Sequence, residues 1–511
     1  MRTQFAETRF RRQLRPVARG AAAGQAMVLG LVLILVLCVG VVVLFDTGQV
    51  VNKKVQLTNA SDAAAYSVAA QQARAFNFAA YMNRGRVANE VTIAQTISVY
   101  SWMNQMHTTS ITMRTAMDVL SAIPYVGVIF KALSAVFKVA EKVFKASRKA
   151  YNPVAQASVR VLDELNGAFA MAATSVIEGV ARIDGYKTAN DVVKANVADA
   201  EIGVVGKGVL VAQLFAAESK YLDTFRIPRS GNGGPATGST QQRAGADRYR
   251  NVVMQSRDGF SSDRHETVDL WLIKFTAAGG TDQVEYSRWA AVDTMGLEVN
   301  LPWPLDDIDM PLGWGGAQAV PSYRNQRFMP GFANGRGWYS EYDRVRNGPY
   351  GDSARKNRWP SRMVDGDANV ALDGGQHKKA YFTGYNGLRN YHDVKKGKAT
   401  DPDGGENAGP IFTVYADTAI ANARTSSSTG IGAPAGSRMA LQDKAQNNKL
   451  AALSSAQVYF NRPPNYDLFR RKKDDKLEMG NLFSPYWQAR LVDTPTATKT
   501  ALLAAGAAGF N

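Results

Sequence analysis

One long uncharged segment constrains what this chain can fold into. No charged residue occurs from Gly20 to Phe45, and the stretch from Ala26 to Phe45 is apolar. At a rise of about 1.5 Å per residue, about 20 such residues cross a hydrocarbon core of about 30 Å. Residues 20–45 are therefore predicted to form a single transmembrane helix.

The residues on either side of this segment predict its orientation. Arginines dominate residues 1–19, where Glu7 is the one acid, and positive residues are retained in the cytoplasm. A cleaved signal peptide is the alternative, but its apolar region is typically about 7–15 residues and ends in a small-x-small site. Leu44-Phe45-Asp46 follows here instead. We expect a retained anchor, a cytoplasmic basic arm over residues 1–19 and an extracytoplasmic body.

Cysteine content and charge limit the remaining options. Cys38 is the one cysteine and lies inside the predicted span, so no intramolecular disulfide can form and packing must stabilise the body. The formal net charge is +16, with lysines and arginines scattered along the chain. Such a surface is usually a solvated one, so no nucleic-acid partner is expected, although binding to cell-wall polymer or DNA is kept as an alternative.

Residues 46–228 are predicted to be a helical extracytoplasmic region, because they are rich in alanine and lack proline until Pro124. The expected helices are one that continues the span, one over 126–150 and one from Val154 to about Phe225. The second is amphipathic, with Ile129, Leu133, Val136, Phe137, Ala140 and Phe144 at helical spacing and lysines on other faces. It could lie on a membrane surface, but we expect it to bury its apolar stripe in a helical bundle or stalk.

The second half of the chain has a different character. Residues 229–245 are predicted to be a flexible linker, 246–490 a β-rich and loop-heavy domain, and 491–511 an Ala/Gly-rich tail. Expected strands lie at 268–275, 283–286, 380–383 and 456–460, and a helical stretch is expected at 439–450. The predicted fold class is α+β.

Residues able to do chemistry are scarce. The histidines are His107, His265, His377 and His392, and His265-Glu266 lacks the second histidine of a zinc-protease helix, since Asp269 stands there. Gly203 to Gly208 lacks the spacing of a phosphate-binding loop and is better explained as a helix irregularity.

Two acidic loops and one aromatic cluster are further candidate binding sites. The loops at 365–373 and 401–406 fail the calcium-loop pattern and are expected to be solvated turns. The aromatic cluster could stack on sugars or bases, but it is expected to fill a loop-rich core; it comprises Trp303, Trp314, Trp338, Tyr339, Tyr342 and Trp359, with Arg324, Arg327, Arg336, Arg344 and Arg346. We therefore predict no catalytic, cofactor-binding or metal-ligating residue and no cofactor.

The N-terminal motifs resemble a known family. Arg19 to Ala26, the apolar span, Phe45-Asp-Thr-Gly-Gln49 and Leu57-Thr-Asn-Ala-Ser-Asp-Ala-Ala-Ala-Tyr66 are similar to the N-terminal module of TadE/TadG-like Flp (tight adherence, Tad) pilus-assembly proteins. The resemblance covers residues 19–90. Segments near 458–463 and 481–490 are similar to the C-terminal end of larger TadG-like proteins.

The resemblance carries expectations and two departures. It implies a non-enzymatic component of Tad/Flp pilus assembly in a bacterial inner membrane, whose partners are other Tad proteins or pilins and whose N-terminal helix can oligomerise. Gln25 and Leu29 occupy the positions where family pilins carry the glutamate that follows the processing glycine. The Asp-x-Ser-x-Ser metal motif of many TadG proteins does not occur in the sequence. A membrane-tethered periplasmic enzyme acting on glycans is kept as an alternative.

Overall fold

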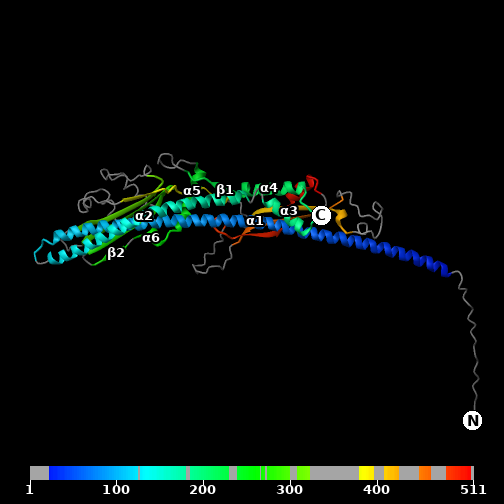
Figure 1. The fold of residues 1–511 in the computed structure, drawn as a ribbon, viewed down its shortest axis with the longest axis horizontal. Coiled ribbons are helices and arrows are strands. Elements are labelled where there is room, and N and C mark those ends of the chain that lie inside the picture. Colours follow the sequence, from blue (N-terminus) through cyan, green and yellow to red (C-terminus); the bar gives the residue numbers. More distant parts are fainter. Residues whose placement is uncertain are drawn as a thin grey trace, which may run out of the picture.

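The computed structural model describes residues 22–124, 127–179, 184–228, 239–264, 266–270, 273–299, 308–322, 379–395, 408–424, 448–461 and 479–507. Its main feature is helix α1, Ala22–Leu120, which runs along the whole molecule (Figure 1). At about 1.5 Å per residue it is about 150 Å long. No proline interrupts it, and the helix continues through Gly48 and Gly85.

A second long helix pairs with this spine. Helix α2, Gly127–Gly179, folds back against α1 after a turn at residues 121–124. The expectation that one helix would end and another begin near Pro153 is wrong, because Pro153 lies inside α2. Shorter helices follow: α3 Gly185–Asn196, α4 Val204–Tyr221, α5 Thr240–Gln255, α6 Gly259–Ser262 and α11 Thr496–Ala504.

The amphipathic prediction for the start of α2 is partly wrong. Phe144 faces α1, where its ring meets that of Trp102 at 5.9 Å between centroids. Ile129 and Val136, however, are 63% and 62% exposed. The buried face is rotated from the expected one, because among the described residues only α1 covers this part of α2.

The strands form three sheets. The largest has the order β2-β3-β4-β5-β6 and is antiparallel except for the parallel β5–β6 pair. A second has the order β10-β9-β8, and β1 pairs with β7. The strand bounds are β1 Leu222–Phe225, β2 Glu266–Asp269, β3 Ile273–Glu285, β4 Arg288–Val299, β5 Ile308–Val320, β6 Lys379–Thr383, β7 Tyr391–Val394, β8 Ala408–Ala419, β9 Lys449–Phe460 and β10 Trp487–Val492.

The α+β prediction is confirmed, with local corrections. Phe225 lies in a strand rather than at the end of a helix, and Lys449 and Leu450 begin β9 rather than ending a helix. Residues 439–447 lie outside the described ranges, as does most of the predicted linker. The domain boundaries stay a prediction.

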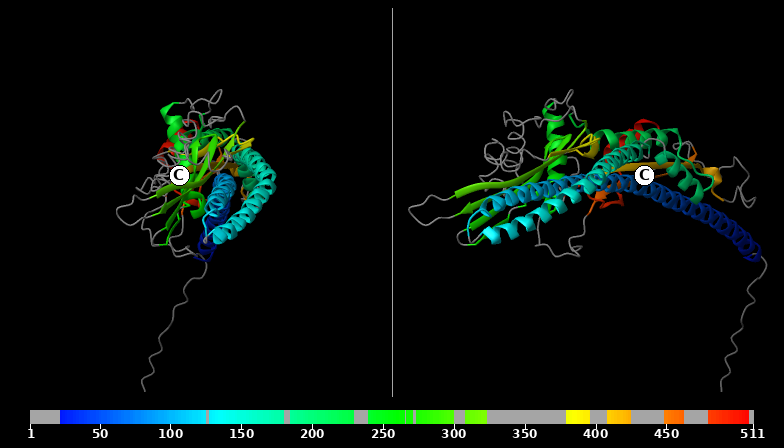
Figure 2. Two further views of the ribbon diagram at one scale, coloured as in Figure 1. Left: turned by 90° about the vertical axis from the view of Figure 1, so that its left-hand side faces the viewer. Right: turned by 60° about the vertical axis from the view of Figure 1, so that its left-hand side comes forward.

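In the half of the molecule farther from the apolar start of α1, this helix lies between the five-stranded sheet and α2 (Figure 2). The sheet approaches α1 closely because β5 carries glycines: a Cβ on Gly315 would overlap the carbonyl oxygen of Ser101, and one on Gly313 would overlap Thr109. Small residues thus let a strand backbone rest on a helix backbone. The larger apolar cores among the described residues are one shared by α1, α3, α4 and the β8–β10 sheet and one shared by α1, α2, α5 and the five-stranded sheet.

Candidate functional site

The start of α1 is bare of any covering element. From Ala26 to Phe45 almost every side chain is exposed, and Leu29, Leu33 and Leu37 expose 67%, 56% and 60% of their surface. Within the described residues, α1 is the one helix long and apolar enough to cross a membrane, with a mean hydropathy of 3.4 over its most apolar 18 residues. An exposed apolar helix of this length has no favourable place in water.

The next turns of α1 change from bare to packed. Leu57, Ala60, Ser61, Ala64 and Ala65 are fully buried. Apart from Leu57 their side chains are small, so the β8–β10 sheet lies close to the helix. The Ser61 hydroxyl donates a hydrogen bond to the Ala452 carbonyl of β9 at 3.4 Å. The Leu57–Tyr66 segment therefore joins the exposed span to the folded body.

Lysines strengthen this junction at its end nearest the span. The Lys54 ammonium donates to the Ala451 carbonyl, and burial lowers the pKa of Lys54. Lys53 forms an ion pair with Asp199 at 2.6 Å. Burial opposes ionisation of Asp199, but the hydrogen bonds from Lys53 and its neighbours outweigh it and lower the pKa of that carboxyl.

The part of α1 that passes from exposed to packed matches a family signature. The model of the family described as putative Flp pilus-assembly TadE/G-like matches residues 24–72. Residues 24–72 form a Tad module. The predicted resemblance is confirmed over that range. No curated protein and no solved structure matches the chain significantly. The Tad module supports a role in pilus assembly, and its family is one of assembly proteins rather than of enzymes.

Exposed apolar side chains lie on the side of the Tad module opposite its buried face. Val51, Val55 and Tyr66 are 56%, 52% and 47% exposed. At 3.6 residues per turn they lie in line with Leu37, Val41 and Leu44 of the span, which are also exposed. This stripe continues the apolar surface of the span along the body, although the exposed Asn59 and the half-buried Asp62 lie between Val55 and Tyr66.

Asp62, the acid of the Asp-Ala-Ala-Ala segment, lies at the rim of an open hollow of about 600 Å³. Ser454 and Ser455 of β9, Asp493, Thr494 and Lys499 of α11 also line it. The Ser455 hydroxyl is 2.8 Å from those of Thr413 and Thr494. This polar hollow brings the Tad module and the C-terminal segment together, which the sequence did not indicate.

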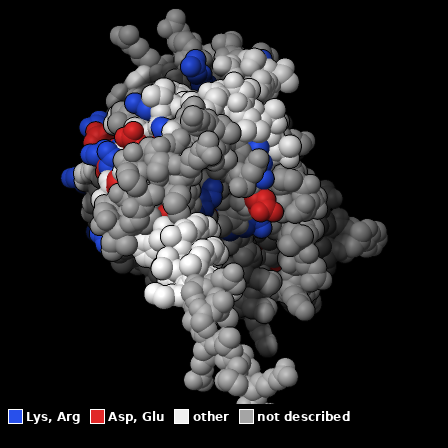
Figure 3. Space-filling model, turned by 90° about the vertical axis from the view of Figure 1, so that its right-hand side faces the viewer, with Lys and Arg blue, Asp and Glu red and all other residues white. Residues whose placement is uncertain are grey.

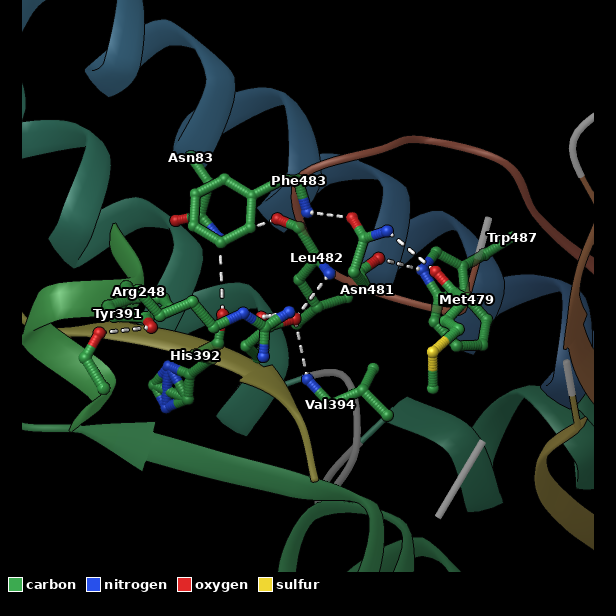
Figure 4. Close-up of polar contacts among 12 residues, drawn as sticks. Asn83, Arg248, Tyr391, His392, Val394, Met479, Asn481, Leu482, Phe483 and Trp487 are labelled. Atoms are coloured by element: carbon green, nitrogen blue, oxygen red, sulfur yellow. Dashed lines mark hydrogen bonds and ion pairs between the residues drawn. The ribbon is translucent and has the colours of Figure 1, made fainter. Parts of the chain in front are cut away.

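Further along the molecule, Asn83 of α1 and the buried acid Asp393 of β7 both hold the segment around Leu482 (Figure 4). The Asn83 amide donates to the carbonyls of Leu482 at 2.7 Å and His392 at 3.3 Å. Asp393 of β7 is fully buried, accepts from the Leu482 and Val394 amides at 2.7 and 2.8 Å, and forms an ion pair with Arg248 at 2.6 Å. Burial raises the pKa of Asp393, although the Arg248 cation opposes that shift.

Replacing Asp393 with asparagine should lower the free energy of unfolding by about 1–3 kcal/mol. The amide oxygen can still accept from Leu482 and Val394, but the NH2 group can no longer pair with Arg248. Chemical denaturation in detergent measures the change. Asp247→Asn, one residue before Arg248, is the matched control: Asp247 instead accepts from the Tyr286 hydroxyl at an exposed site. An equal loss of stability in Asp393→Asn and Asp247→Asn would contradict a stabilising role for the Asp393–Arg248 ion pair.

A second buried acid lies on α1 where it meets α2 and the five-stranded sheet. Glu90 accepts hydrogen bonds from the Trp289 indole at 2.9 Å, the Tyr385 hydroxyl at 2.7 Å and the Asn166 amide at 3.0 Å. Burial raises the pKa of Glu90 to about 7, against the lowering effect of the Trp289 and Tyr385 hydrogen bonds. Asp163 of α2 extends the cluster to Asn386 and Arg389.

The residues singled out in the sequence do not assemble into a reaction centre within the described ranges. His107 and His392 are buried, on α1 and β7, and His392 lies 3.1 Å from the Thr224 hydroxyl. Gly203 precedes the first turn of α4, and Gly206 approaches the Tyr415 carbonyl, where a Cβ would lie 2.5 Å away. Across the described part of the chain, no cluster of three His, Cys, Asp or Glu suits a metal.

His265, His377, both acidic loops and most of the aromatic cluster lie outside the described residues, and of Trp314 only the backbone, in β5, is described. The absence of catalytic, cofactor and metal residues therefore stays a prediction. Glu90, Asp163 and Asp393 were not predicted from the sequence, although an acid within an apolar helical stripe, as at Glu90, is a signal for burial.

The described residues on the face from which α1 emerges carry mixed charge. Viewed from the end at which α1 emerges, basic and acidic side chains lie interspersed among uncharged ones (Figure 3). The described part of this face therefore does not resemble a nucleic-acid interface, where basic side chains gather.

Proposed function

We propose that this protein is a single-pass, TadG-like and non-enzymatic component of Tad/Flp pilus assembly. Its basic arm lies in the cytoplasm of a bacterial cell, residues 20–45 cross the inner membrane, and the body lies on the far side. The observation that carries the proposal is the Tad module itself: one unbroken helix that is bare and apolar over Ala26–Phe45 and is held to the body through Leu57–Ala65.

The rigid connection suits an assembly component. Because the span and the spine are one helix, a displacement of the span is transmitted to the body without a hinge. The apolar stripe of Val51, Val55 and Tyr66 faces away from the body at the level where a second membrane-anchored helix would emerge. Helix pairs bury such stripes, so another Tad-module protein or a pilin is the proposed partner.

Site-specific crosslinking in native membranes tests this proposal. With Cys38→Ser as background, a photocrosslinker at Val55→Cys or Tyr66→Cys should capture a second Tad-module protein or a pilin. Gln56→Cys is the matched control, because Gln56 is exposed but lies outside the stripe. Capture of a Tad component from the control position alone would contradict the proposed interface.

The stripe should also be required for assembly. The double variant Val55→Arg with Tyr66→Arg should reduce pilus number about tenfold, the change that a loss of about 1.4 kcal/mol in association produces. Both side chains are half exposed, so protein level and the protease-resistant core should not change. Full piliation in this variant would count against the proposal, whereas loss of the protein itself would require the milder Val55→Ser with Tyr66→Ser.

A further inference from the structure

The N-terminal half of α2 exposes an apolar face that the proposed function does not use. Val128, Ile129, Val136, Val139 and Val143 expose 79%, 63%, 62%, 61% and 54% of their surface. Helical spacing places them on one side of α2, and Leu133, 40% exposed, borders them. Val119 and Ile123, 70% and 44% exposed, continue the patch to the turn between α1 and α2. We call these residues the α2 face.

Lysines follow this face along the same helix. Lys131, Lys138, Lys142, Lys145 and Lys149 are all exposed and recur at intervals that keep them on one stripe, beside the side of α2 that packs on α1. Glu141 is the one acid of the Gly127–Ala150 segment, and it already forms an ion pair with Arg114 of α1 at 3.0 Å. Asp118 of α1 accepts a hydrogen bond from Ser134. The local charge is therefore strongly positive.

The composition of this surface distinguishes between occupants. Protein interfaces are enriched in aromatic residues and arginine and depleted in lysine, whereas the α2 face consists of Val, Ile and Leu bordered by lysine. The one arginine of the Gly127–Ala150 segment, Arg148, is turned inward and donates to Asn104 of α1 at 2.6 Å. Pairing with a second copy would bring two lysine stripes together. An apolar stripe bordered by lysines is instead typical of helices that lie on anionic lipid.

We propose that the α2 face docks on the surface of an anionic bilayer, with the lysines contacting lipid phosphates and the aliphatic side chains entering the acyl boundary. Asp46 to Leu120 is continuous helix, so the turn between α1 and α2 lies about 110 Å along α1 from the end of the transmembrane span. This bilayer is therefore a second one, distinct from the membrane that residues 20–45 cross. The protein would bridge two lipid surfaces.

The test uses the full chain. The protein is reconstituted through its span into nanodiscs of phosphatidylcholine and mixed with vesicles of phosphatidylcholine containing about 30 mol % phosphatidylglycerol. Flotation should recover the nanodiscs with these vesicles but not with vesicles of phosphatidylcholine alone, and about 0.5 M salt should weaken the capture. Equal recovery with both vesicle types would overturn the proposal.

Matched variants assign the contact to the α2 face. Lys138→Gln with Lys142→Gln should weaken partitioning about 30-fold, since each lysine near an anionic surface is worth about 1 kcal/mol. Lys187→Gln with Lys194→Gln, exposed lysines of α3, should not. Val136→Asp with Val139→Asp should abolish capture, while Val204→Asp, at an 89% exposed position of α4, should leave it intact. The proposal is wrong if the α2 variants behave like their controls. It is also wrong if the lysine variant still captures vesicles but loses a protein partner that a crosslinker at Val139→Cys captures in native membranes.

Discussion

The free energy of unfolding of Glu90→Gln minus that of the parent protein should rise by about 3 kcal/mol as the pH is raised from about 4.5 to about 8. Burial raises the pKa of Glu90 to about 7 in the folded protein, above its value of about 4.5 in the unfolded chain. Between these values the folded parent binds more protons than the unfolded chain, so its stability falls as the pH rises. Because glutamine cannot titrate, the variant does not show this pH-dependent loss of stability.

The measurement is denaturant unfolding in detergent at a series of pH values. Burial also shifts the pKa of His392, downward, and that of Asp393, upward, but both groups are present in parent and variant, so the difference isolates Glu90. Glu164→Gln, at an exposed position of α2, is the matched control and should show no such gain. Parallel pH profiles for Glu90→Gln and the parent would show that Glu90 does not titrate in the range its burial predicts.

Trp487→Ala should cost about 3–5 kcal/mol of stability. Trp487 of β10 is 3% exposed, and its ring meets those of Phe76 on α1 at 5.1 Å and Phe460 on β9 at 5.4 Å between centroids. Its indole donates to the Asn481 carbonyl, and Asn77 of α1 bonds both its backbone amide and its carbonyl at 2.9 Å. The substitution removes the ring that holds β10 to the spine just beyond the Tad module.

Limited proteolysis and denaturant unfolding should show this loss, with cleavage appearing first between β9 and β10. Trp487→Phe keeps a ring and should recover part of the stability. Leu491→Ala, on the same strand at a 50% exposed position, should change stability by less than about 0.5 kcal/mol. A Trp487→Ala protein as stable as Leu491→Ala would mean that β10 is not held to α1 through this ring.

Patterns that depend on neighbours in the chain could be predicted from the sequence. The apolar run over Ala26–Phe45 needs a hydrophobic thickness and no partner within the chain, so its length and composition were enough to predict the span. The Leu57–Tyr66 signature is local in the same way, and it predicted the Tad module. Alanine content and the lack of proline predicted that helix continues beyond the span, although not that α1 would run unbroken to Leu120.

What the sequence could not give depends on contacts between residues far apart in the chain. Proline inside a helix costs about 3 kcal/mol in isolation, but α2 continues through Pro153 because packing against α1 outweighs that cost. Glu90 becomes a buried acid because Trp289, Tyr385 and Asn166 converge on it from other elements.

The same reasoning applies to the surfaces of the long helices. Periodicity showed that α2 has an apolar stripe, but only the position of α1 decided that Phe144 would be covered and Val136 left exposed. The sequence by itself determined an apolar anchor that continues as helix and carries a Tad module. The tertiary structure decided which faces of that helix and of α2 remain open, because burial is set by the elements that reach a surface and not by the pattern that surface carries.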